Sequence, residues 1–180
     1  MNASTIEILK LITSILTPIS VVVIGLFINK RLKVFEHKQW KNQKLIEKRL
    51  EIYSELFPLF NDLFCYYTFV GNWKDLSPED IIKHKRIIDK KIHLSIPLFS
   101  DEFINSCFEF MNSCFDTYTG WGKDPQLRTT IRRHKQFFSG DWNQHWDTLF
   151  CNTDMSADED DIENKYSNMM SAFSKEIGLQ

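Results

Sequence analysis

Apolar residues near the start of this chain form one unbroken run, and the rest of the sequence places its apolar positions at helical spacing. The run extends from Leu11 to Ile28, eighteen positions without a charged side chain. At about 1.5 Å per residue, such a helix spans about 27 Å, close to the hydrocarbon thickness of a bilayer. A buried core helix is the alternative, but it usually keeps charged residues on one side. We therefore expect a transmembrane anchor within residues 1–29.

The charges on either side of this run predict its orientation. Glu7 and Lys10 precede it, whereas eight Lys or Arg residues lie between Lys30 and Arg49. Because cytoplasmic flanks are enriched in Lys and Arg, we expect the N-terminus outside and the C-terminal part in the cytoplasm. A cleavable signal peptide would need a basic leader and a small-residue cleavage site, which the sequence lacks. The prediction is a single-pass membrane protein with an uncleaved anchor.

Residues 30–57 predict a basic juxtamembrane helix. No Gly or Pro interrupts them before Pro58, and their apolar residues recur at helical spacing. One long helix should therefore leave the membrane and continue into the cytoplasmic domain. Its cations suit anionic lipid headgroups, at about 1 kcal/mol for each one near the surface. With Phe35 and Trp40 among them, nucleic acid is a second candidate ligand.

Helix-start signals divide the remaining residues, 58–180. Ser77-Pro78-Glu79-Asp80 combines a capping residue, a proline and acids at one helix start, and Ser100 begins another helix. The expected helices are 78–95, 101–118, 126–135, a short aromatic one capped by Asp141, and a last one that begins at the acidic stretch 158–163. No stretch alternates at the period of a strand. The sequence thus predicts an all-α fold, in which one transmembrane helix precedes an up-and-down helical bundle.

Aromatic and sulfur-containing residues bear on the core. Fifteen Phe and five Trp residues indicate an aromatic core, or a core together with an extensive subunit interface. Cys65, Cys107, Cys114 and Cys151 form no CxxC pair, and a cytoplasmic location would keep them reduced. We expect buried thiols, with no disulfide, metal site or cofactor.

Three hydroxyl residues share one face of the predicted span. Thr13, Thr17 and Ser20 follow an i, i+4, i+7 spacing. Such a face suits contact between helices or the lining of a wet passage, although hydroxyls in membrane helices often bond back to their own backbone. They are our candidate pore-lining residues.

Strong catalytic signatures are missing from the sequence. It has no Walker loop, HExxH, GxSxG or dinucleotide fingerprint. What remains is the R-x5-H spacing of Arg128 and His134. A ribonuclease that cleaves by 2′-hydroxyl attack needs a proton-transfer group and a fixed cation, which His and Arg supply. Two other Arg–His pairs in the chain have similar spacings, so a structural role for this pair stays equally open.

The span, the basic linker, the helical domain and the Arg128/His134 element together resemble the small membrane accessory protein of type VI-B CRISPR systems, which carries a divergent HEPN-like domain. The resemblance implies a ring-shaped homo-oligomer, expected to be an octamer, that forms a membrane pore and enhances antiviral defence by an RNA-guided ribonuclease. Thr129 departs from the commoner HEPN motif, which has Asn, Asp or His after the Arg.

We therefore expect a non-enzymatic effector first. A membrane-tethered HEPN ribonuclease that uses Arg128 and His134 on RNA is the alternative, and an anchored adaptor that recruits a cytoplasmic partner is a third.

Overall fold

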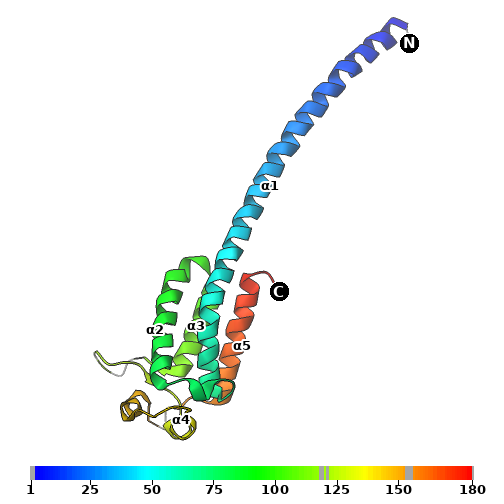
Figure 1. Ribbon diagram of the computed structural model, residues 1–180. Helices are drawn as coiled ribbons and strands as arrows, with labels where there is room; N and C mark the ends of the chain where they lie inside the picture. The colour runs from blue at the N-terminus through cyan, green and yellow to red at the C-terminus, as the bar shows by residue number, and fades with distance from the viewer. Residues whose placement is uncertain (1–2, 118–119, 121, 153–155, 180) are drawn as a thin grey trace. The chain divides into compact units, whose positions relative to one another are not determined.

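The computed structural model describes residues 3–117, 120, 122–152 and 156–179, and most of them are helical (Figure 1). The chain divides into two compact units, Met1–Leu45 and Ile46–Gln180. One helix, α1 (Ala3–Thr68), belongs to both units. The predicted long N-terminal helix and the mostly helical fold are confirmed. The division at Leu45 falls inside the segment 30–57.

The first unit is an exposed stretch of helix. Every side chain from residue 12 to residue 44 is exposed, including apolar ones such as Val23 and Phe27, each 59% accessible. Burying one large apolar side chain is worth about 1.5 to 3 kcal/mol, so water is a poor solvent for such a surface. Among the described residues, α1 is the one helix long and apolar enough to cross a membrane.

The second unit is a bundle. The C-terminal part of α1 lies beside α2 (Pro78–Ser95), α3 (Asp101–Cys114) and α5 (Glu159–Glu176), as Figure 1 shows. A short 3-10 helix, η1 (Trp73–Asp75), follows the turn after α1. Large side chains fill the space between the helices. Those that are fully buried include Phe60, Tyr66, Phe103, Phe110 and Phe115. The aromatic surplus of the sequence is therefore accounted for, at least in part, by this core.

The predicted starts of α2, α3 and α5 are confirmed, and each has a capping hydrogen bond. Ser77 Oγ accepts a hydrogen bond from the backbone N–H of Asp80 (3.1 Å), and the Asp80 carboxylate accepts one from the backbone of Ser77 (3.4 Å). Ser100 caps α3 through the backbone N–H of Phe103 (3.3 Å), and Asp158 caps α5. These bonds satisfy backbone donors that the first turn of a helix leaves unpaired.

The prediction that the third helix runs to residue 118 is wrong. It ends at Cys114, and β1 (Phe115–Asp116) pairs antiparallel with β2 (Gln126–Leu127). The backbone N–H of Arg128 also donates to the carbonyl of Cys114 (2.9 Å). Strands of two residues are too short to show alternation, so only the folded chain reveals them. Tyr118, which we placed on that helix, lies outside the described residues.

Two further predictions are corrected here. The helix expected over residues 126–135 is α4 (Ile131–Phe137), because residues 126–128 use their backbone groups in the strand pair. The short aromatic helix is a 3-10 helix, η3 (Gln144–Leu149), and Asn143 caps it in place of Asp141. The Asn143 side-chain oxygen accepts from the backbone N–H two residues later (3.0 Å), the local bond that Asn favours at turns.

Arg49 fastens α1 into the second unit. Its Nε donates to the carbonyl of Leu98, in the short helix η2 (Ile96–Leu98), at 2.7 Å. Its Nη2 lies 2.7 Å from the carboxylate of Glu176 at the end of α5, and that carboxylate also accepts from the backbone of Ser100 (2.8 Å). The Glu176 side chain is only 6% exposed, so these charge-assisted bonds form away from most solvent. We call this group the Arg49 node.

Candidate functional site

Arg128 lies in the link between β2 and α4, and its backbone is fixed on both sides. Its N–H donates to Cys114 and its carbonyl accepts from the backbone N–H of Ala157 (2.8 Å). The side chain is half-buried, and its Nε is buried without a hydrogen-bond partner in the described part of the chain. The backbone of Arg128 is therefore held beside the strand pair.

His134 lies on α4 and is buried among aromatic rings. Its side chain is 3% exposed. The imidazole stacks on Tyr66 with ring centroids 3.9 Å apart, and the rings of Phe69 and Trp73 lie 5.0 and 5.6 Å away. Its Nε2 is 3.3 Å from the hydroxyl of Thr129. We call this group, His134 with Tyr66, Phe69 and Trp73, the aromatic cage.

The cage determines the charge state of His134. Burial, with a smaller contribution from the positive charge of Arg133, lowers the pKa of His134 from 6.5 to about 3. A buried site disfavours the charged imidazolium because it replaces water with apolar surroundings. His134 is therefore neutral at physiological pH.

The structure thus gives the R-x5-H pair a different environment from the one a catalytic pair needs. A general acid or base must come within hydrogen-bond distance of the reacting atoms, and in a single chain the imidazole of His134 is enclosed by Tyr66, Phe69 and Trp73. No hydrogen bond joins Arg128 to His134 in the part of the chain that the structure describes. The spacing identifies two residues that lie close to the strand pair and α4, but it does not show that the imidazole is buried.

A pocket of about 500 Å³ lies beside this motif, and the sequence gave no sign of it. Its lining includes Thr129, Thr130, Arg132, Arg133 and Cys151. Two guanidinium groups and two hydroxyls suit an anion better than a cation. Arg133 is already partly engaged, since it lies 3.8 Å from the centre of the Phe69 ring and 3.5 Å from the Glu159 carboxylate.

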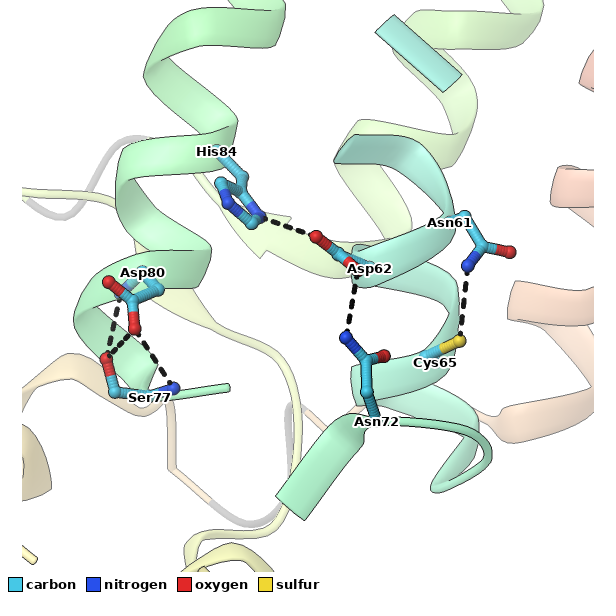
Figure 2. Close-up of polar contacts among 7 residues, drawn as sticks. All are labelled: Asn61, Asp62, Cys65, Asn72, Ser77, Asp80 and His84. Carbon is cyan, nitrogen blue, oxygen red and sulfur yellow. Dashed lines mark hydrogen bonds and ion pairs between the residues drawn. The ribbon is translucent and has the colours of Figure 1, made fainter. Parts of the chain in front are cut away.

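A second polar cluster, also unforeseen, joins the end of α1 to α2 (Figure 2). Nδ1 of His84 is 3.7 Å from the Asp62 carboxylate, a distance that makes an ion pair when the imidazole is protonated. Asn72 donates to the other oxygen of Asp62 (3.3 Å), while Asn61 lies 3.5 Å from the sulfur of Cys65. Asp62 and His84 belong to no local motif, so nothing short of the fold brings them together.

The thiols are placed as inert packing groups. Cys65, Cys107 and Cys114 are buried, and Cys151 is half-buried. Burial raises the pKa of all four thiols, and the charge of Asp62 adds to the rise at Cys65. The reactive form of cysteine is the thiolate, which these surroundings disfavour. Within the described residues, no three His, Cys, Asp or Glu side chains are grouped so that they could hold a metal ion.

The hydroxyl residues of the span bond to their own helix. Thr13 donates to the carbonyl of Lys10 (3.0 Å), Thr17 to that of Thr13 (2.6 Å) and Ser20 to that of Leu16 (2.8 Å). A hydroxyl oxygen has two acceptor lone pairs, so the exposed hydroxyls of Thr17 and Ser20 can accept hydrogen bonds from water while they donate to the helix. Their role as pore-lining residues stays a prediction.

Comparison of the chain with protein-family models, with curated proteins and with solved structures gives no match.

Proposed function

We propose that this chain is a single-pass inner-membrane protein that self-assembles into a pore and depolarises the membrane, as a non-enzymatic antiviral effector. One observation carries the proposal: in the apolar run of α1, every side chain that the structure describes, from residue 12 to residue 28, is exposed. A core helix of a soluble domain would be covered, whereas lipid is a solvent for such a surface. The N-terminus lies outside and the bundle in the cytoplasm, as the basic residues from Lys30 to Arg49 favour.

Self-assembly follows from the single span. One helix cannot enclose a passage, so several copies must surround one axis, each adding a face of Thr13, Thr17 and Ser20. Those hydroxyls would offer water the acceptor groups that a lumen needs. The resemblance to the accessory protein of type VI-B CRISPR systems suggests an octameric ring and a functional partnership with the RNA-guided nuclease.

The proposal is tested by changing Thr13, Thr17 and Ser20 together to Leu. Insertion should persist, because the span becomes more apolar, while a lumen lined by these residues becomes narrower and drier. Depolarisation, followed with a potential-sensitive dye at matched protein levels in the membrane fraction, should fall strongly. The matched control changes Val22 and Val23 to Leu, which adds bulk off the hydroxyl face and should leave depolarisation intact.

A triple variant that depolarises as well as the parent chain would remove these residues from the lumen. A parent chain that inserts but never depolarises the membrane would end the pore proposal and leave the anchored adaptor.

The ribonuclease alternative needs His134 to reach RNA, and its burial argues against that. The purified chain should therefore leave single-stranded RNA intact. Cleavage by the parent chain that is lost in His134→Ala would reinstate the enzyme.

A further inference from the structure

The stalk, residues 28–45 of α1, carries a regular pattern that neither lipid nor water requires. Its charged residues are Lys30, Arg31, Lys33, Glu36, Lys38, Lys41 and Lys44. The uncharged residues include Leu32 and Phe35, which are 50% and 57% exposed. The charged and the uncharged residues are not distributed evenly around the helix.

One row of uncharged residues in the stalk follows a spacing of four and three, while other uncharged residues, such as Val34 and Trp40, lie off it. The row consists of Ile28, Leu32, Phe35, Gln39 and Asn42, and we call it the seam. This is the heptad spacing that places residues on one side of a helix facing a partner helix. No charged residue occupies the seam, although seven charged residues lie in the stalk. Of these, Lys30, Lys33, Lys41 and Lys44 fall at the outer heptad positions.

We propose that the seam is a parallel helix-to-helix contact between copies of this chain. The inference deepens the proposed self-assembly and rests on it, since a shared membrane orientation makes the two stalks parallel. Leu32 and Phe35 supply the apolar contact. Gln39 and Asn42 are polar seam residues of the type that fixes register at some cost in stability.

Charge complementarity points to a second copy as the occupant. In a parallel pair, the residue just before one seam position lies opposite the residue five places later in the partner. Arg31 and Glu36 stand in this relation, so each stalk pairs its cation with the other's acid. Within one chain, the Arg31 guanidinium lies over the ring of Phe27, 4.9 Å from its centre. A lipid surface would give the acid at position 36 no favourable partner.

The same spacing continues into the span. Ser14, Pro18, Val21 and Gly25 extend the row from Ile28 toward the N-terminus. Three of the four are small or lack a backbone donor, and a side chain added at Gly25 would meet no atom within 4 Å of the same chain. Small residues let membrane helices approach closely. The hydroxyl face, Thr13, Thr17 and Ser20, lies to one side of this row, so one helix can contact a neighbour and still present hydroxyls to a lumen.

Cysteine cross-linking tests the seam in membranes that contain the full chain. Phe35→Cys lies in the seam, and Val34→Cys is its matched control on the outer side. In one chain the two side chains are equally accessible, at 57% and 54%. Mild oxidation should therefore cross-link Phe35→Cys several-fold more than Val34→Cys, and the parent chain, whose thiols are buried or half-buried, gives the background. Equal yields at the two positions would overturn the seam.

A charge exchange tests the parallel register in the Phe35→Cys background. Arg31→Glu or Glu36→Arg alone places like charges opposite each other and should lower the yield, whereas the two changes together should restore it. A double variant that cross-links as poorly as either single one would overturn the pairing. An oligomer that forms without preferential cross-linking at position 35 would refute the seam but keep the proposed function, whereas a chain that stays monomeric would refute both.

Discussion

At the scale of single residues, His134 shows how a motif-like spacing can serve packing. The neutral imidazole is flat, so it can stack on Tyr66 while its Nε2 meets the Thr129 hydroxyl. Such a side chain fills an aromatic space and also satisfies a buried hydroxyl, which Phe could not do. As a consequence, the stability of the folded chain depends on the protonation of His134.

That dependence gives the first prediction. The pKa of His134 is about 3 in the folded chain and 6.5 in the unfolded one, so between these values the unfolded chain binds the extra proton. Stability is therefore complete above pH 6.5 and falls as the pH drops toward 3, by about 2 kcal/mol at pH 5. Thermal unfolding of the full chain in mild detergent at pH 7.5 and pH 5 measures the loss.

His134→Phe should lose this part of the acid sensitivity, while His145→Gln, a change at an exposed imidazole, should retain it. An acid response identical in His134→Phe and the parent chain would show that the imidazole is not the source.

Sequence patterns at this scale single out Arg128 and His134, but they leave open whether the pair is catalytic or structural. Their spacing is a property of the chain, whereas the aromatic cage is made by Tyr66, Phe69 and Trp73, more than sixty positions before the imidazole in sequence. The exposure of the His134 imidazole, and hence its chemistry, depends on those distant residues. The sequence around His134 therefore cannot predict whether the imidazole is buried.

At the scale of elements, predictions succeeded where a local bond determines the structure. Ser77 and Ser100 are predicted to begin helices because a serine side chain can bond to a backbone N–H three residues later, and the structure shows both bonds. The pair β1–β2 was missed because it depends on Phe115 meeting Leu127 across a turn. The start of α4 was predicted too early for the same reason, because the strand pair uses the residues that precede the helix.

The cap of α2 gives the second prediction. Ser77→Ala removes the bond to the Asp80 backbone and should cost about 1 kcal/mol, or about 4 °C in the thermal midpoint. Ser171→Ala changes an exposed serine on α5 and should leave the midpoint nearly unchanged. The two variants are compared by circular dichroism in the same detergent. Equal midpoints for the two would mean that the Ser77 cap adds nothing to the bundle's stability.

At the scale of the whole molecule, the two units differ in how far their apolar residues are covered. The second unit buries an aromatic core of its own, although some of its apolar residues, such as Leu94 and Phe137, are exposed. The first unit leaves its apolar residues exposed. We therefore expect assembly to depend on α1 more than on the bundle. At this scale the sequence is most informative, because a run of eighteen uncharged residues can be recognised without knowledge of the tertiary structure.

The third prediction concerns assembly. Light scattering of the detergent-solubilised chain at micromolar concentration should give a protein mass several times the 21.4 kDa of one copy. Leu32→Asp with Phe35→Asp should shift the mass toward one copy, because a buried unpaired charge is costly. Lys33→Asp with Val34→Asp introduces the same acids on the outer side and should keep the assembly. A parent chain that elutes as a monomer at every concentration would contradict the prediction.

The Arg49 node also bears on how the second unit would respond to a force on α1. Within the second unit, Arg49 joins α1 to two other elements, through its bonds to Leu98 in η2 and to Glu176 in α5. Below it, Phe57 and Phe60 are packed side-on against the neighbouring helices, so α1 would have to slide past many contacts at once. If α1 crosses a bilayer as proposed, we therefore expect a force on α1 to move the second unit as a whole before it separates α1 from α3 and α5.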